Sequence, residues 1–284
     1  MSEKRLLDLR GVYQVDARHV VPGPRAGAGG LGMIRWFGFD IDQPQPVGRR
    51  KIPGGTVKIV FALDGTFAGR RRDPCALVVG MHDRGGVAAH HGRMCSVQVQ
   101  LAPSAARRLL GVPLSELRNS AVDLGEFFGA SAPRLAGRLA ETASWPERFG
   151  LVADYLRQRG APAEDVADPV LAGAVARLRA TRGRIPIAAL ADECGWSRRH
   201  LDRRFADGIG LPPKTYASLQ RFSAALAAVT ETPAPDLCRI ASAAGYFDQS
   251  HLIRDFQRFA GTSPLRLRSE AMSRSSNTAD PSAI

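Results

Sequence analysis

The sequence predicts an α+β protein in which a β-rich, barrel-like N-terminal domain with trailing helices precedes an all-α C-terminal domain. Segments rich in β-branched and aromatic residues dominate the first 100 residues, and helical periodicity replaces them after Pro103. An acidic segment interrupted by proline then separates the two parts. The expected divisions are a domain at 1–160, a linker at 161–169, a domain at 170–270 and a flexible tail at 271–284.

Three segments of the N-terminal part have the composition of β-strands. They are 35–41 (RWFGFDI), 56–63 (TVKIVFAL) and 95–101 (CSVQVQL), the last with strict polar and apolar alternation. The Asp-Gly pair at 64–65 predicts a tight turn directly after the second segment. Clusters of Gly and Pro predict loops at 22–32, 44–48 and 53–55.

Apolar residues recur at three- and four-residue intervals after Pro103. This spacing predicts amphipathic helices at 103–110, 133–139 and 145–159. Residues 160–169 (GAPAEDVADP) are acidic and contain two prolines, which is typical of a linker. The helical pattern then continues to about Glu270, and the Ser-rich end of the chain has no periodicity.

The composition excludes several classes of protein. With 44% hydrophobic and 23% charged residues, the chain is neither disordered nor fibrous. No stretch approaches the ~20 consecutive apolar residues of a membrane helix, and no signal peptide begins the chain, so we expect a cytoplasmic protein without a membrane partner. The net charge of +12 divides equally between residues 1–169 and the shorter 170–284. The denser charge of the second part favours a polyanionic partner such as DNA.

Side chains that serve in catalysis or metal binding occur without the patterns that predict such sites. The four cysteines form no Cys-x-x-Cys pair, and neither Cys75 nor Cys95 has a flanking base. His82, His90, His91 and Cys95 are near one another in the sequence, but their spacing is irregular and adjacent residues of a strand point to opposite faces. We therefore expect no metal, no cofactor and no enzymatic activity.

A near-repeat in the C-terminal part is the strongest signal in the chain. Its copies are 190–205 (LADECGWSRRHLDRRF) and 240–256 (IASAAGYFDQSHLIRDF), and one inserted residue changes their offset from 50 to 51. The identities are Ala191/Ala241, Gly195/Gly245, His200/His251, Leu201/Leu252, Arg203/Arg254, Phe205/Phe256, Gly210/Gly261 and Pro213/Pro264.

Each copy has the features of a helix-turn-helix unit, and the units are expected at about 187–210 and 237–261. A short helix ends at a glycine, which adopts the left-handed conformation without a Cβ clash. Ser197 or Asp248 then caps a second helix, in which a Leu and a Phe four residues apart face inward. The matching histidines His200 and His251 lie beside these apolar residues, which favours a packing role over ligand binding.

The outward faces of the two second helices carry side chains that can read DNA bases. Arg binds guanine bidentately, Gln binds adenine, Asp accepts from cytosine and Ile contacts the thymine methyl group. The predicted base-reading residues are Arg199, Asp202, Arg203, Gln249, Ser250, Ile253 and Arg254. Asp202 also brings a negative charge near the phosphates, which weakens the expected binding of the first unit.

A linking helix is expected between the copies. Residues 213–229 (PKTYASLQRFSAALAAV) have apolar residues at helical spacing over a length of about 25 Å. Such a helix would hold the units in one rigid body and help to separate the reading helices by roughly one DNA turn of ~34 Å. A helical bundle with polar exposed faces is the alternative, and the tandem repeat argues against it.

Residues 170–268 resemble the C-terminal DNA-binding domain of AraC/XylS-type transcription regulators, most specifically at 244–264 (AGYFDQSHLIRDFQRFAGTSP). The resemblance implies a seven-helix unit that places two recognition helices in adjacent major-groove segments, with the seven residues above facing the bases. It makes Arg198, Arg204 and Arg258 candidates for phosphate contact or solvated surface. It also implies an N-terminal domain that senses a small-molecule effector or forms a homodimer, and RNA polymerase as a partner.

The sequence thus predicts a sequence-specific regulator, of the activator type, that binds double-stranded DNA. Two alternatives stay open. The first is an architectural protein that binds DNA without sequence preference. The second is a DNA-repair alkyl-acceptor enzyme fused to the DNA-binding domain, which would need an activated thiol at Cys75 or Cys95.

Overall fold

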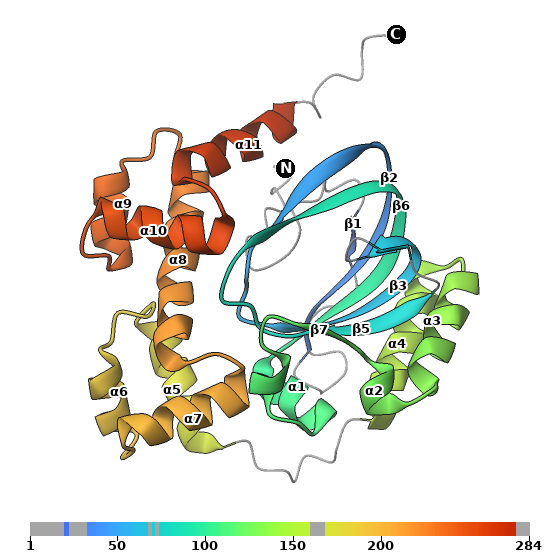
Figure 1. Cartoon of the computed structure of the whole chain (residues 1–284), viewed down its shortest axis with the longest axis horizontal. Helices are drawn as coiled ribbons and strands as arrows, with labels where there is room; N and C mark the ends of the chain where they lie inside the picture. Colours follow the sequence, from blue (N-terminus) through green and yellow to red (C-terminus); the bar gives the residue numbers. More distant parts are fainter. Residues whose placement is uncertain (1–19, 23–32, 68–69, 72–73, 160–167, 277–284) are drawn as a thin grey trace.

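The computed structural model describes residues 20–22, 33–67, 70–71, 74–159 and 168–276. Figure 1 shows a curved sheet with helices along it in the N-terminal part, and a second, wholly helical part beside the sheet. This arrangement confirms the expected α+β class. The loop expected at 22–32 lies outside the described residues except for Pro22, which ends a strand.

The N-terminal part is built on one antiparallel sheet. Its strands follow the order β1-β2-β6-β3-β5-β7, with β4 paired to β3. The long β2 and β3 flank β6, so that the centre of the sheet comes from segments that are not adjacent in the sequence. The strands are β1 (Val20–Pro22), β2 (Met33–Lys51), β3 (Val57–Phe67), β4 (Arg70–Arg71), β5 (Cys75–Val79), β6 (Gly86–Leu101) and β7 (Ala121–Asp123).

Two expected interruptions of the strands are wrong. The Asp-Gly pair at 64–65 does not turn the chain, because β3 continues through it with a register shift between Ala62 and Asp64 that absorbs the extra residue. The segment 44–48 is likewise part of β2, whose pairing with β6 shifts between Gln43 and Val47. Prolines are tolerated at such irregular positions because the ladder there requires no N–H donor. The loop at 53–55 is confirmed.

Helices cover the sheet as the periodicity predicts. Ala132, Leu135 and Leu139 of α3 and Phe149 and Leu156 of α4 are buried. The short β7 had no sequence signal because three residues are too few to show a period. The helices are α1 (Pro103–Leu110), the 3-10 helix η2 (Leu114–Leu117), α2 (Gly125–Phe128), α3 (Ser131–Glu141) and α4 (Trp145–Arg159).

The C-terminal part consists of α5 to α11 in the described residues. Two expected boundaries move: Asp168, assigned to the linker, caps α5 by accepting from the N–H groups of Val170 and Leu171, and the tail expected from 271 is helical to Ser276. The rest of the linker and tail lies outside the described residues. The helices are α5 (Pro169–Ala180), α6 (Ile187–Glu193), α7 (Arg198–Ile209), α8 (Pro213–Glu231), α9 (Leu237–Ala244), α10 (Gln249–Ala260) and α11 (Pro264–Ser276).

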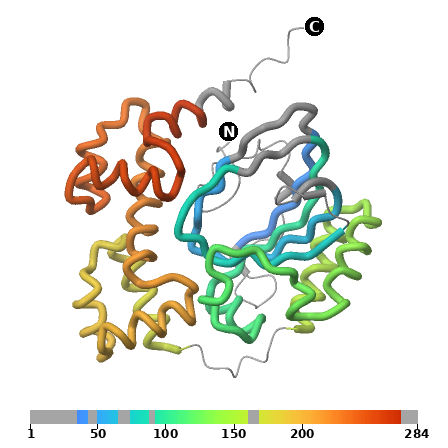
Figure 2. Tube along the Cα trace, viewed as in Figure 1, coloured from blue at the N-terminus to red at the C-terminus, as the bar shows by residue number. Residues whose placement is uncertain are grey.

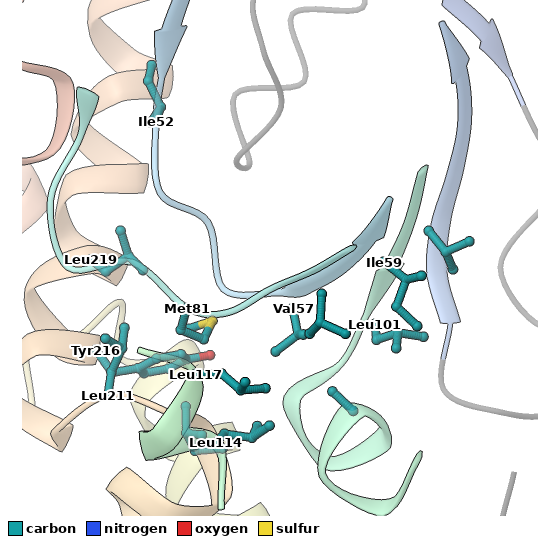
Figure 3. Packing of buried hydrophobic residues seen from close by; sticks show 14 of the residues in the cluster. Ile52, Val57, Ile59, Met81, Leu101, Leu114, Leu117, Leu211, Tyr216 and Leu219 are labelled. Atoms are coloured by element: carbon teal, nitrogen blue, oxygen red, sulfur yellow. The ribbon is translucent and has the colours of Figure 1, made fainter. Parts of the chain in front are cut away.

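The apolar core is continuous between the two parts of the chain. Met81 and Leu114 belong to the same buried cluster as Leu211 and Tyr216 of the C-terminal part, and Figure 3 shows these side chains close together. In the Cα trace, the orange segment of α8 runs alongside the N-terminal part (Figure 2). The helical part is therefore packed against the sheet part and not tethered to it by the linker alone.

Candidate nucleic-acid interface

The first helix-turn-helix unit is formed by α6 and α7. Gly195, with φ of 67°, lies in the left-handed region after α6. The Ser197 Oγ then accepts a hydrogen bond of 3.2 Å from the backbone N–H of His200, which caps α7. The His200 ring stacks edge-on against Trp196 at 5.0 Å, as a packing residue does.

The second unit is formed by α9 and α10 and repeats this geometry. Gly245, with φ of 81°, ends α9 in the left-handed conformation. The Asp248 carboxylate accepts a hydrogen bond of 2.6 Å from the backbone N–H of His251, which caps α10. The His251 ring stacks edge-on against Tyr246 at 5.1 Å. Both caps and both packing histidines predicted from the repeat are confirmed.

The inward faces of both units are anchored on α8. Phe205 of α7 is fully buried and meets Tyr216 with a ring distance of 5.6 Å. Phe256 of α10 is also fully buried and meets Phe222 at 5.0 Å. The 19 residues of α8 span about 28 Å, and Figure 1 shows α7 and α10 at its two ends. One rigid helix therefore fixes the distance between the units.

The predicted base-reading residues lie on the first two turns of α7 and α10. Those of α7 (Arg199, Asp202 and Arg203) are exposed, as are Ser250 and Arg254 of α10, whereas Gln249 and Ile253 are half-buried. Within α7, an Nη2 atom of Arg203 lies 3.3 Å from the Nδ1 of His200. The exposed side chains of this set are therefore accessible from outside the protein.

Some of the predicted readers have contacts within the second unit. Gln249 accepts a hydrogen bond of 3.2 Å from the Sγ of Cys238, which lies on α9. The Nε of Arg254 lies 3.4 Å from the backbone oxygen of Ser250. These contacts hold the side chains along the helix surface, and a base edge would have to compete with them.

The three candidate phosphate contacts differ in their surroundings. Arg198 is exposed at the start of α7. Arg204 forms an ion pair of 2.5 Å with Asp168, the cap of α5. Arg258 donates a hydrogen bond of 2.9 Å from its Nε to the backbone oxygen of Asp83 in the N-terminal part. Two of the three guanidinium groups are therefore bound to the protein itself.

Asp83 is the central polar residue between the two parts, and no motif or spacing in the sequence indicates its role. Its carboxylate is buried, and it accepts hydrogen bonds from Arg118, Asn119 at 3.0 Å and Arg84 at 3.4 Å. Burial alone would raise the pKa of Asp83, but the hydrogen bonds from Arg118 and Asn119 prevail and lower the pKa to about 2. Asp83 is therefore charged at neutral pH and close to Arg258, with 3.9 Å between Oδ2 and Nη2.

Further hydrogen bonds, one of them between backbone groups, join the N-terminal part to the C-terminal part. The N–H of Gly85 donates a hydrogen bond of 2.8 Å to the carbonyl oxygen of Arg258, and a Cβ at Gly85 would overlap the carbonyl oxygen of Phe259. At the other unit, the Oγ of Ser115 donates a bond of 3.1 Å to Asp207 of α7. The C-terminal ends of α7 and α10 are thus held by the N-terminal part, while their N-terminal ends face outward.

An ion pair with α11 completes the junction. The Nε of Arg50 lies 2.6 Å from the Oε2 of Glu270, and its Nη2 lies 2.8 Å from the Oε1 of the same carboxylate. A bidentate pair between Arg and a carboxylate is a strong, geometrically specific contact. No pattern in the sequence indicates that Arg50 and Glu270 would form one. The pKa of Glu270 is lowered chiefly by this hydrogen bond.

The cysteines and the candidate metal ligands have the following surroundings in the described part of the chain. Burial raises the pKa of the Cys95 thiol, the opposite of an activated nucleophile. All four cysteines lie in the described part of the chain, and no disulfide joins them. Within the same part, no group of three or more His, Cys, Asp or Glu side chains is placed to hold a metal ion. No described helix combines the length and apolarity needed to cross a bilayer.

Comparison with known families gives two matches. Residues 190–270, which include both units, match the family described as helix-turn-helix domain. Residues 33–123, which include most of the sheet, match a family described as a domain of unknown function (DUF6597). No curated protein matches the sequence.

Several solved structures are similar. The DNA-binding domain of AdpA, in complex with a target DNA, is 29% identical and covers 38% of this chain and 96% of its own, with a TM-score of 0.35. ToxT from Vibrio cholerae is 10% identical and covers 84% of this chain and 97% of its own, with a TM-score of 0.45. The xylose-binding transcription activator XylR is 19% identical and covers 50% of this chain and 38% of its own, with a TM-score of 0.33.

Proposed function

We propose that residues 190–270, which match the family described as helix-turn-helix domain, are the DNA-binding part of an AraC/XylS-type transcription regulator. In this proposal the protein is a sequence-specific regulator that reads two adjacent major-groove segments. The observation that carries this proposal is the pair of capped helices, α7 and α10, whose outward first turns are held at the two ends of α8. A recognition helix uses its N-terminal residues to contact base edges.

The proposed readers are Arg199, Asp202 and Arg203 in the first unit and Gln249, Ser250, Ile253 and Arg254 in the second. In this proposal Arg198, which is exposed, can contact phosphate directly. Arg204 must first break its ion pair with Asp168, and Arg258 must first break its hydrogen bond to Asp83. The expected operator therefore has two half-sites of different sequence, because the two sets of readers differ.

Selection of bound sequences from a random DNA pool tests the function directly. The full chain is expected to enrich one bipartite site. Arg254→Ala should then weaken binding to this site by about 1–3 kcal/mol and relax base choice at one position. Arg134→Ala, which removes one exposed charge on α3, is the matched control and should have little effect. Equal losses on operator and random DNA would show that Arg254 does not read a base.

An architectural DNA binder is the second candidate, because the basic charge of the chain would support it. Such a protein would enrich no sequence, and its affinity would fall steeply and uniformly with salt. The selection experiment separates the two candidates. The alkyl-acceptor enzyme has no observation in its favour, and we propose that the protein is not an enzyme.

We also propose that the N-terminal part regulates DNA binding, through a small-molecule effector or by forming a homodimer, and that the bound protein recruits RNA polymerase as an activator. The contacts of Asp83 and Ser115 with the ends of α10 and α7 support this idea, because a change in the sheet part would reach both units. Sedimentation of the full chain with and without operator DNA tests the dimer, and in vitro transcription tests recruitment.

A further inference from the structure

The tandem units differ by one inserted residue in the turn. In the first unit, Trp196 alone separates the glycine from the N-cap Ser197. In the second unit, Tyr246 and Phe247 separate the glycine from the N-cap Asp248. Both caps accept a hydrogen bond from the backbone N–H three residues later, so the insertion adds a residue to the turn while the capping bond of the following helix is kept.

Phe247 is the surplus residue. Tyr246 is buried and stacks on His251 at 5.1 Å, just as Trp196 stacks on His200 at 5.0 Å, so Tyr246 occupies the structural position of the tryptophan. Phe247 is 92% exposed, more than any other large hydrophobic residue in the described part of the chain. A phenyl ring in water is unfavourable, and here it makes no contribution to the core.

The position of Phe247 adjoins the proposed reading surface. It directly precedes Asp248, whose carboxylate is hydrogen-bonded to the backbone of α10, so the cap fixes where the turn lies relative to the helix. Gln249 follows two residues later, within about 7 Å along the backbone. When the first turn of α10 enters the major groove, residue 247 therefore lies at the edge of the same groove.

Three exposed arginines lie in and beside this unit, together with the carboxylate of Asp248 next to Phe247. The exposed Arg184 packs its aliphatic stem close to Gly245, where a Cβ would contact it. Arg239 of α9 and Arg254 of α10 are also exposed in this unit. An apolar ring among cations matches double-stranded DNA, which presents anionic phosphates beside one apolar group in the major groove, the C5-methyl of thymine.

We propose that Phe247 is a specificity-determining residue whose ring packs on a thymine methyl group at the edge of the half-site bound by α10. This inference rests on the proposed function and extends it to a residue outside the helix. The first unit has no equivalent side chain. The half-site of the second unit should therefore contain a thymine that the half-site of the first unit does not require.

A double-mutant cycle between protein and DNA tests the contact. The selected operator is synthesised with each thymine of the second half-site replaced singly by deoxyuridine, which removes only the methyl group. One replacement is expected to weaken binding of the wild-type chain about fourfold, the value of one methyl-sized apolar group. Phe247→Ala should weaken binding of the normal operator by a similar factor or more. In that variant, the deoxyuridine replacement that weakens binding of the wild type should cause no further loss of affinity.

Two variants serve as controls. Phe247→Leu keeps an apolar side chain and should retain sensitivity to the methyl group. Leu265→Ala removes another exposed apolar side chain, on α11, and should leave DNA binding unchanged. The thermal unfolding of Phe247→Ala should match that of the wild type, because the ring is not packed.

Several results would overturn the proposal. One is an unchanged operator affinity of Phe247→Ala under conditions in which Arg254→Ala binds weakly, which would leave the proposed function intact. A second is a uniform loss with no replacement singled out, which would assign Phe247 to the DNA backbone. A third is normal DNA binding with reduced activated transcription, which would assign Phe247 to RNA polymerase. If the wild-type chain selects no site, the proposed function itself fails.

Discussion

The two helix-turn-helix units share their inward residues and differ in their outward ones. Leu201 and Leu252 are fully buried at equivalent places, and both units end their first helix at a glycine and cap the second with a side-chain oxygen. Among the identities within the second helices, the pair Arg203/Arg254 is the one with exposed side chains. Identity within the repeat therefore marks packing and chain geometry.

The differences lie on the outward faces of the second helices and in the turn before α10. The first unit presents Asp202 between arginines, whereas the second presents Ile253 and the exposed Phe247. The C-terminal ends differ too, because α7 is held through Ser115 and α10 through Asp83. One duplicated scaffold thus supports two proposed reading surfaces and two attachments to the N-terminal part, and substitutions can test each separately.

The largest expected effect tests whether the two cores are equivalent. Phe205→Ala and Phe256→Ala each remove a fully buried ring that packs on α8, and each should lower the free energy of unfolding by about 3–5 kcal/mol. Urea unfolding of the two variants measures this. A loss below about 1 kcal/mol in one variant alone would show that the two units do not depend on α8 to the same degree.

The next effect tests the attachment of the second unit. Asp83→Asn removes the carboxylate that Arg118 and Arg258 approach, and should lower the free energy of unfolding at pH 7 by about 2 kcal/mol. Because the folded-state pKa is lowered from 3.8 to about 2, the contribution is complete above pH 4 and is lost as the pH falls through 2.

Urea unfolding at several pH values between 2 and 7 provides the measurement. The difference between wild type and Asp83→Asn should shrink as the pH falls across that window. Asp154→Asn, which removes an exposed carboxylate on α4, is the control and should have a small effect at every pH. A constant difference between wild type and Asp83→Asn would show that charge is not what Asp83 contributes.

These interactions show what the sequence can and cannot predict. The helix boundaries near 103, 145, 213 and 237 were predictable because each depends on local periodicity, a proline or a cap. The turn expected at residues 64–65 was wrong because pairing with β6 overrides local turn chemistry. The outward residues of α7 and α10 were predictable from the repeat.

The junction between the two parts was not predictable. Arg50 meets Glu270 across 220 positions of the chain, and Arg258 meets Asp83 across 175. Neither pair has a spacing or a motif that a single sequence displays. For the same reason the sequence did not reveal that Arg204 and Arg258 are bound within the protein.

A smaller effect compares the two caps. Ser197→Ala and Asp248→Ala each remove the acceptor of a backbone N–H at the start of a reading helix, and each should lower the free energy of unfolding by about 1 kcal/mol. The loss should be larger for Asp248, because its charge also interacts favourably with the helix dipole. Thermal unfolding of both variants tests the order, and a larger loss for Ser197→Ala would contradict it.

The smallest effect concerns Asp202, the acidic residue among the proposed base-reading residues of the first unit. Asp202→Asn keeps the size of the side chain but removes a negative charge from the exposed surface that is proposed to face the DNA. Binding to random DNA should tighten about twofold, near 0.5 kcal/mol, and the difference should fade at high salt because exposed charges are screened. Glu147→Gln on α4 removes an exposed charge away from both units and should leave binding unchanged. If Asp202 accepts from cytosine, the same variant should also lose discrimination at one position of the first half-site, where no substitution in α10 has an effect.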